Sequence, residues 1–290
     1  MIKNTFFGGI VLLLISAISA CNVNNESAEA TAFADSTKIV SINGTVSEIL
    51  VDLGFEDNII GVDVASTYPA SLNAKPKVGH SQQMAAEGII ALGPDVVIGT
   101  TSDVKPELAE QIRNSGVKLL LFDQEFSPEG TKNLIRSIAD SLNRTAKGDS
   151  LISVVEADLA KADAIEKTEP KPKVLFIYAR GTGTMMVAGN GTQVEKIIEL
   201  AGGENAVGGF TDYKPLTAEA LVAANPDVIL LFDSGLSSLG DTDGLLEVQG
   251  VKETNAGKNR KIIGMDGQFL TGFSQRLGKA VLELAEKIHQ

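Results

Sequence analysis

One thirteen-residue segment occurs twice in the chain, and no other feature of the sequence restricts the possible folds as strongly. The two copies, which align without a gap and share six identical positions, are residues 86–98 (AEGIIALGPDVVI) and 218–230 (AEALVAANPDVIL). Each copy predicts a short helix that begins with a glutamate, directs its apolar positions (89, 90 and 92, or 221, 222 and 224) toward a core, and stops at a proline. The apolar run after the proline suits a strand buried on both faces.

Turns of this kind, from a helix into a buried strand, also occur in parallel sheets without any duplication. Six identities in thirteen positions nevertheless exceed what a shared structural class requires. The duplication therefore predicts two similar α/β lobes. A cleft between two lobes is a common place for a small ligand to bind.

The N-terminal residues have the pattern of an export signal. Lys3 precedes an apolar run at 6–18 that is short for a membrane span, and small residues follow this run. Cys21 stands directly after Ser-Ala, as in a bacterial lipobox, and we expect it to be lipidated rather than to be a buried thiol. On this interpretation residues 1–20 are a lipoprotein signal peptide, and residues 21–37, which are polar, small and acidic, are a flexible tether. Cys21 is the only cysteine, so stability depends on the core and not on an internal disulfide.

Charge and length restrict the possible partners of the protein and its possible domain organisation. The 37 acidic residues exceed the 25 basic ones, for a formal net charge of −12, so nucleic acid is not an expected partner. The roughly 250 residues after the tether exceed what most single cores contain. Residues 147–167 have the pattern of an amphipathic helix that spans about 30 Å. The apolar positions of this helix are Leu151, Val154, Val155, Leu159, Ala162 and Ile165.

We therefore expect an α/β fold of two Rossmann-like α/β lobes joined by one long helix, with a ligand cleft between the lobes. The expected N-terminal lobe is residues 38–144, the connecting helix lies within residues 145–169, and the C-terminal lobe is residues 170–290.

Two loops that follow predicted strands are expected to line this cleft, because ligands of open α/β sheets bind beyond the carboxyl ends of the strands. The strand at 59–62 leads into a loop that contains Tyr68, and the strand at 173–178 leads into residues 179–184. Tyr68 could simply pack on Pro69. A phenolate oxygen is also a known type of ligand for haem iron, which makes Tyr68 the candidate metal ligand of the chain.

Histidine and glycine patterns argue against two other kinds of site. His80 and His289 are the only histidines and are too far apart for a zinc-site spacing; His289, near the end of a closing helix predicted at 273–289, is expected to be a solvated tail residue. Gly181-Thr-Gly183 lacks the third glycine of a dinucleotide fingerprint, because Met186 stands at that position. We find no Ser-His-Asp set and no paired carboxylates in equivalent loops. The chain is thus not expected to be an enzyme, and a nucleotide-dependent two-domain enzyme is the most distant alternative.

Short motifs spread over nearly the whole chain, from about residue 38 onward, point to one family. They are Thr67-Tyr68-Pro69, Val78-Gly79-His80, Ala86-Glu87-Gly88, Ala179-Arg180-Gly181-Thr182-Gly183, Leu200-Ala201-Gly202-Gly203-Glu204-Asn205-Ala206, Tyr213-Lys214-Pro215-Leu216, Met265-Asp266-Gly267 and Gly272-Phe273. Together they resemble the substrate-binding lipoproteins of ABC importers whose two lobes are joined by one long helix, and within this class the haem-binding branch. The resemblance implies a periplasmic or cell-surface protein that captures haem and delivers it to an ABC permease. A ferric siderophore or cobalamin on the same fold is the alternative ligand.

The resemblance also implies roles for residues near the ligand. It makes Tyr68 the axial ligand of the haem iron. It places a cation from the opposite lobe, Lys214 or Arg180, near the phenolate or a haem propionate, where the charge would stabilise the deprotonated ligand. His80 stands where some relatives have a tyrosine and is a candidate second contact.

The resemblance also implies that two further residues contact a partner protein. Glu87 and Glu219 match the glutamates, one on each lobe, that dock on arginines of the permease dimer, which works with its ATPase. Two symmetrically placed charges suit a two-fold transporter. The alternative, which is compatible with docking, is that both glutamates only stabilise the first turns of their helices. Together with a lipid on Cys21, these roles imply a protein anchored to a bacterial membrane.

Overall fold

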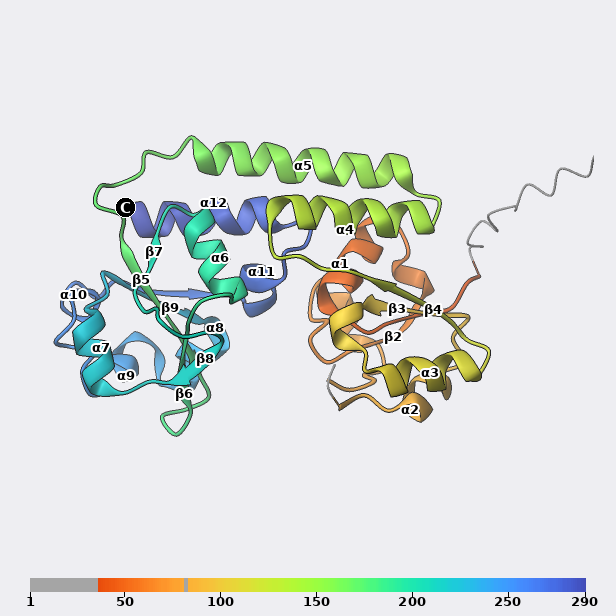
Figure 1. Cartoon of the computed structure of the whole chain (residues 1–290), viewed down its shortest axis with the longest axis horizontal. Coiled ribbons are helices and arrows are strands. Elements are labelled where there is room, and N and C mark those ends of the chain that lie inside the picture. The colour runs from red at the N-terminus through yellow and green to blue at the C-terminus, as the bar shows by residue number, and fades with distance from the viewer. Residues whose placement is uncertain (1–35, 81–82) are drawn as a thin grey trace, which may run out of the picture. The chain divides into compact units, whose positions relative to one another are not determined.

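Two separate β-sheets organise the chain, and each forms the centre of one α/β lobe (Figure 1). The computed structural model describes residues 36–80 and 83–290. The predicted signal peptide, Cys21 and most of the predicted tether lie outside the described residues. Within the described ranges, no helix has both the length and the apolar character that a membrane span requires.

The first lobe is built on a four-stranded parallel sheet. In spatial order its strands are β2 (Ile59–Val62), β1 (Ile39–Ser41), β3 (Val96–Thr100) and β4 (Lys118–Phe122). Its helices are α1 (Gly44–Asp52), α2 (Ala86–Ile90), α3 (Pro106–Asn114) and α4 (Pro128–Ser141), and 3-10 turns lie at Glu56–Asn58, Ala70–Ala74 and Thr101–Asp103. β1 and β3 are buried throughout, as expected for strands covered on both faces. The loops that follow the four parallel strands therefore gather at one edge of the sheet.

The second lobe has a mixed sheet. Its strands run in the order β10 (Ile262–Met265), β9 (Val228–Phe232), β5 (Lys173–Ala179), β6 (Met185–Ala188) and β8 (Tyr213–Pro215), and the two-residue strand β7 (Glu204–Asn205) also pairs with β5. β5, β9 and β10 are parallel, whereas β6 is antiparallel to β5 and to β8. The helices are α6 (Gln193–Leu200), α7 (Ala218–Ala224), α8 (Asp233–Ser238), α9 (Asp241–Leu246), α10 (Asn255–Lys258), α11 (Gly267–Thr271) and α12 (Leu277–His289). The lobes thus share a parallel centre and differ at one sheet edge.

The duplicated segment forms the same unit in both lobes. α2 leads into β3, and α7 leads into β9. Both turns contain a left-handed residue before the proline, with φ of 65° at Gly93 and 40° at Asn225, conformations that glycine and asparagine accept most readily. The prediction that position 222 faces the core is wrong, because the Val222 side chain is 45% exposed while Leu221 is buried. Successive helical residues point about 100° apart, and in α7 the buried face includes Leu221 but not its neighbour.

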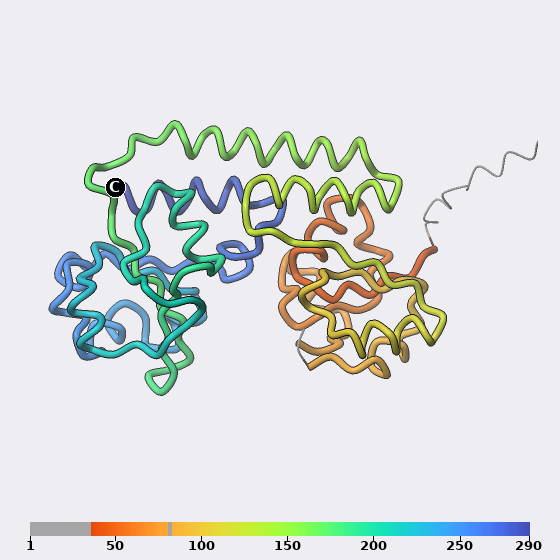
Figure 2. The backbone as a smooth tube through the Cα atoms, viewed as in Figure 1, coloured from red at the N-terminus to blue at the C-terminus, as the bar shows by residue number. Residues whose placement is uncertain are grey.

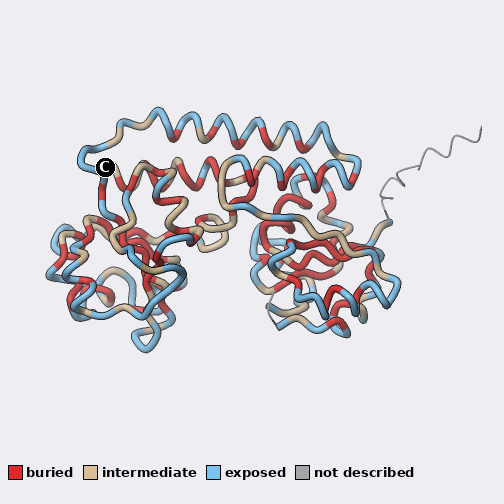
Figure 3. The backbone as a smooth tube through the Cα atoms, in the orientation of Figure 1, coloured by how far each residue is buried: buried red, intermediate tan, exposed pale blue. Residues whose placement is uncertain are grey.

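The predicted connector is α5 (Thr145–Asp163), which packs against α4 of the first lobe and α12 of the second (Figure 2). Ile152 and Val155 belong to the core of the first lobe, and Ala162 belongs to the core of the second. Buried and exposed residues alternate along α5 (Figure 3). Val154 is 47% exposed, so its predicted place on the apolar face is wrong. Two α/β lobes joined by one long helix are confirmed.

The C-terminal segment differs from the sequence prediction in two respects. The closing helix begins at Leu277 rather than at residue 273, because α11 and a loop over 272–276 precede it. His289 is not a solvated tail residue. The Thr168 N–H donates to His289 Nδ1 (3.0 Å), and Nε2 lies 3.0 Å from the Ala201 carbonyl oxygen. The ring therefore joins the end of α12 to the chain that follows α5 and to the end of α6.

Candidate functional site

A cavity of about 630 Å³ lies between the lobes, at the carboxyl ends of their strands. Residues after β1, β2, β3 and β4 line it from the first lobe, and residues after β9 and β10 line it from the second. This is where open α/β sheets bind ligands, and the volume is in the range of small-molecule sites. The lining combines two aromatic rings, Phe126 and Phe232, with amide and hydroxyl groups and the carboxylates of Asp103 and Asp266.

A network of polar groups anchors the loop that carries Tyr68. The Ala65 N–H donates to Asp63 Oδ2 (3.0 Å), and the Ser66 hydroxyl donates to the other oxygen of Asp63. Ser47 Oγ lies 2.7 Å from Ser66 Oγ and extends this network toward β1. Lys77 Nζ donates to the Ser66 carbonyl oxygen (2.9 Å). These bonds fix the backbone immediately before Tyr68.

Burial shifts the pKa values of the two charged groups of this network in opposite directions. Burial raises the pKa of Asp63 above its ordinary value, although hydrogen bonds from Ser66 and Ala65 oppose the rise. Burial lowers the pKa of Lys77, and the Asp63 carboxylate opposes that change. In both cases the charged form loses part of its hydration, and the neighbouring protein groups replace part of it.

This burial makes a prediction about pH and stability. Because the folded state raises the pKa of Asp63 above 3.8, the folded protein holds this proton more tightly than the unfolded chain does. The contribution of Asp63 to the free energy of unfolding therefore falls as the pH rises from about 4 toward neutrality. Asp63→Asn removes this dependence, so the free energy of unfolding of the variant relative to the natural protein should move in the variant's favour between pH 4 and pH 7.

Urea denaturation at the two pH values measures this change. The exposed carboxylate of Asp57 provides the control, and Asp57→Asn should give a smaller change with pH. A constant offset between Asp63→Asn and the natural protein, or a shift in the opposite direction, would contradict the prediction.

Tyr68 is exposed although its loop is well anchored. The residue is 44% exposed, and its packing on Pro69 stays an alternative. The Arg276 guanidinium carbon lies 3.7 Å from the centroid of the Tyr68 ring. Arg276 in turn donates to both carboxylate oxygens of Glu48, which is fully buried in α1. Burial raises the pKa of Glu48, and the hydrogen bond and charge of Arg276 oppose the rise.

Gln268 of α11 connects the second lobe to the residue beside Tyr68. Its Oε1 accepts from the Thr67 N–H (3.1 Å) and the Thr67 hydroxyl (3.0 Å), and its Nε2 donates to the Gly44 carbonyl oxygen (2.8 Å). A Cβ at Gly44 would lie 3.0 Å from Gln268 Nε2 and 3.2 Å from the Ala65 carbonyl oxygen, so glycine at this position permits the close approach. Sequence reasoning missed Gln268, Arg276 and Glu48.

The structure places the other predicted ligand contacts on the surface. The Arg180 guanidinium lies 5.6 Å from the centroid of the Tyr178 ring, and Lys214 Nζ lies 4.5 Å from that of Phe210. Both cations are exposed and contact rings of their own lobe. His80 is also exposed. The contacts of Lys214, Arg180 and His80 with a ligand stay predictions.

The glycines after β5 form a hairpin rather than a phosphate-binding turn. The Arg180 N–H donates to the Thr184 carbonyl oxygen (2.9 Å), and Gly181 has a φ of 64°. The chain then returns as the antiparallel strand β6, whereas a dinucleotide fingerprint requires a helix at this point.

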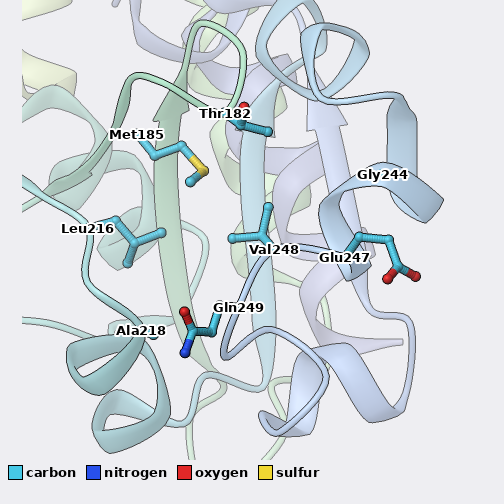
Figure 4. Close-up of a pocket in the computed structure, with 8 residues that line it drawn as sticks. All are labelled: Thr182, Met185, Leu216, Ala218, Gly244, Glu247, Val248 and Gln249. Atoms are coloured by element: carbon cyan, nitrogen blue, oxygen red, sulfur yellow. The ribbon is translucent and has the colours of Figure 1, made fainter.

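Glu87 and Glu219 lie in the first turns of α2 and α7, and both are exposed. Near Glu219, Figure 4 shows Met185, Leu216 and Val248 converging on a cavity of about 340 Å³ in the second lobe. An adjoining hollow of about 500 Å³ is lined by Glu219 itself and by the exposed Val222. The surface around Glu219 therefore combines carboxylates with exposed apolar groups. The docking role of the two glutamates stays a prediction.

Curated proteins with related sequences include binding components of transporters. An uncharacterised ABC transporter substrate-binding lipoprotein of Bacillus subtilis, YvrC, is 28% identical over 259 residues, which cover 87% of this chain and 80% of that protein. A cobalamin-binding protein of Halobacterium salinarum is 24% identical over 87% of this chain and 69% of its own length.

Solved structures with a similar fold include haem-binding proteins. The periplasmic heme-binding protein RhuT from Roseiflexus sp. RS-1 superposes with a TM-score of 0.82 at 39% identity, over 88% of this chain and 98% of RhuT. The periplasmic heme-binding protein BhuT, in complex with two hemes, superposes with a TM-score of 0.81 at 34% identity, over 87% of this chain and 97% of BhuT.

The family model of the periplasmic binding proteins matches residues 39–269, which include both sheets, the connecting helix and most of the residues that line the cavity between the lobes. The chain therefore belongs to the periplasmic binding protein family.

Proposed function

We propose that this protein binds haem outside the cytoplasmic membrane and delivers it to the permease of an ABC importer. The observation that carries the proposal is Tyr68, a half-exposed phenol on a rigid loop beside the inter-lobe cavity. The similarity to RhuT and BhuT, two periplasmic heme-binding proteins, supports this choice of ligand.

The chemistry around Tyr68 favours iron that is already chelated. Among residues 36–80 and 83–290, no group of three or more His, Cys, Asp and Glu side chains could hold a metal ion. Tyr68 would therefore act as one ligand of an iron whose other positions are occupied by the chelate. Haem meets this condition, because the porphyrin supplies four nitrogens and the protein adds an axial ligand. Phe126 and Phe232 in the cleft offer apolar surface to the macrocycle.

The proposal extends to the predicted contacts and the partner. The exposed cations Lys214 and Arg180 are candidates for the haem propionates, and His80 is a candidate second contact. Glu87 and Glu219 are the candidate contacts to the permease. Lipidation of Cys21 would hold the protein at the outer side of the membrane, where the permease receives its substrate.

Haemin titration tests whether haem is the ligand of this protein. Purified protein should bind haemin with a stable stoichiometry and give the absorption spectrum of a high-spin ferric iron with an oxygen ligand. Competition with cyanocobalamin and with a ferric siderophore should leave most of the haemin bound. Displacement of haemin by either competitor at equal concentration would contradict the proposal.

The alternative ligand is cobalamin, because a related curated protein is named for it. The titration above distinguishes the two, since bound cobalamin has its own visible spectrum. A ferric siderophore is the other alternative on the same fold, and the same competition titration distinguishes it from haemin. An enzymatic role would require turnover of a nucleotide or a dinucleotide that copurifies with the protein.

A further inference from the structure

Arg276 has two aromatic neighbours and little access to solvent. Its guanidinium carbon lies 3.7 Å from the centroid of the Tyr68 ring and 5.0 Å from that of Phe269, and its side chain is 15% exposed. A cation over an aromatic face is attracted to the ring, and the attraction increases as water is removed. Arg276 therefore restrains the ring of the proposed iron ligand and not only its backbone.

Glu48 restrains Arg276 in turn. Arg276 Nε donates to Glu48 Oε2 (2.7 Å), Nη2 donates to Oε1, and Ser274 Oγ also donates to Oε2 (2.8 Å). The carboxylate is completely buried. A two-pronged bond between a guanidinium and a carboxylate fixes the plane of the guanidinium as well as its position. The face that Arg276 presents to Tyr68 is thereby set by a residue of α1.

The loop that carries Arg276 is itself docked on the first lobe. The carbonyl oxygen of Gly272 accepts from Thr45 Oγ1 (2.5 Å) and from Gln124 Nε2 (3.0 Å), and that of Phe273 accepts from Thr131 Oγ1 (3.0 Å). This loop joins α11 to α12, which both belong to the second lobe, so its docking is a further contact between the lobes besides α5. The position of Arg276 depends on this docking.

We propose that Glu48 and Arg276 are a positioning pair for the ligand site: Glu48 orients Arg276, and Arg276 holds the Tyr68 ring in the one orientation that haem iron meets. The role of Tyr68 as iron ligand rests on the proposed function, whereas the restraint on its ring exists in the free protein. A side chain that is already ordered loses less conformational freedom when the ligand binds, and this favours affinity.

Fluorine NMR of the free protein tests the restraint without haem. The chain contains three tyrosines, so protein labelled with 3-fluorotyrosine gives three resonances, and Tyr68→Phe identifies that of Tyr68. In Arg276→Gln and in Glu48→Gln this resonance should move toward the position of a tyrosine in unfolded protein and become narrower, while those of Tyr178 and Tyr213 stay in place. Arg276→Lys keeps the charge but not the planar fork, and it should resemble Arg276→Gln.

Haemin titrations of the same variants give the second measurement. Arg276→Gln and Glu48→Gln should each bind haemin about tenfold more weakly, which corresponds to the loss of one largely buried cation–aromatic contact. If Glu48 acts through Arg276, adding Glu48→Gln to Arg276→Gln should have no further effect. This double variant also buries no unpaired charge, so it serves where a single variant fails to fold.

Arg144→Gln is the matched control. Arg144 lies over the ring of Phe55, with its guanidinium carbon 5.1 Å from the centroid, away from the cleft. Arg144→Gln should change neither the Tyr68 resonance nor the haemin affinity. An unchanged Tyr68 resonance in the folded Arg276 variants, or equal haemin affinity of these variants and the natural protein, would overturn the positioning pair. Failure of the natural protein to bind haemin would instead overturn the proposed function.

Discussion

Replacing Tyr68 by alanine is expected to weaken haemin binding by at least about a hundredfold, because even residues that only support a metal ligand change metal affinity by about 10- to 100-fold. The absorption band that joins a phenolate to ferric iron should disappear at the same time. Haemin titration followed by visible spectroscopy measures both effects. The same substitution should have little effect on folding, since the Tyr68 side chain is 44% exposed.

Tyr68→Phe separates the contribution of the hydroxyl oxygen to haemin binding from that of the aromatic ring. It keeps the aromatic face that lies 3.7 Å from the Arg276 guanidinium and removes only the hydroxyl. Iron coordination predicts that phenylalanine is nearly as harmful as alanine. Simple packing of the porphyrin on the ring predicts near-normal affinity for phenylalanine and loss for alanine. The second outcome would show that Tyr68 is a packing residue and not an iron ligand.

Tyr213→Phe provides the control for this pair. Tyr213 is the other tyrosine with a large exposed surface, at 36%. Burial and the nearby Asp212 raise the pKa of Tyr213 above its ordinary value, which disfavours the phenolate form that binds ferric iron. The spectrum of haemin bound to Tyr213→Phe should match that of the natural protein. A loss of the phenolate band in this variant would show that the iron is bound by Tyr213 in the second lobe and not by Tyr68.

Local sequence pattern was sufficient for much of the fold. The duplicated segment predicted α2 with β3 and α7 with β9, because a helix stop at Gly-Pro or Asn-Pro and an apolar run are both local signals. The apolar spacing of α5 predicted the connector in the same way. The errors at Val154 and Val222 have one cause, since each valine stands next to another apolar residue. Two adjacent apolar positions of a helix point about 100° apart, and the sequence does not say which of them faces the core.

The surroundings of Tyr68 could not be predicted in this way. The loop after β2 is a local feature, but the residues that restrain it come from the other end of the chain. The bond from Arg276 to Glu48 joins positions separated by 228 residues, and that from Thr67 to Gln268 spans 201. No periodicity connects such positions. The one usable signal is Glu48, a charged residue directly before the apolar run Ile49-Leu50-Val51 on α1, which indicates a buried partner without identifying it.

Charge reversal at Glu87 and Glu219 is expected to stop haem uptake while leaving haem binding intact. Both carboxylates are exposed in the first turns of their helices, and the described part of the chain shows no ion pair for either. Like charges at a protein interface cost several kcal/mol, so lysine at either position should lower transport through the importer by more than tenfold, and lysine at both should abolish it. Uptake of haemin by cells or proteoliposomes that contain the importer measures transport, and titration of the purified variants measures binding.

The control must reverse a charge at an equivalent helical position elsewhere. Glu129 lies in the first turn of α4 and is 74% exposed, although it pairs with Lys132 at 2.6 Å. Glu129→Lys removes a favourable interaction with the helix dipole, worth about 0.3–1 kcal/mol, as the other two reversals do. Stability should therefore fall by small amounts in all three variants, and somewhat more for Glu129→Lys because this variant also loses the ion pair with Lys132. Uptake should fall only for Glu87→Lys and Glu219→Lys. If these two variants transport haemin normally, their glutamates only stabilise helix ends. If they lose haemin binding, the glutamates belong to the ligand site, because an interaction with the permease alone cannot alter the affinity of the isolated protein.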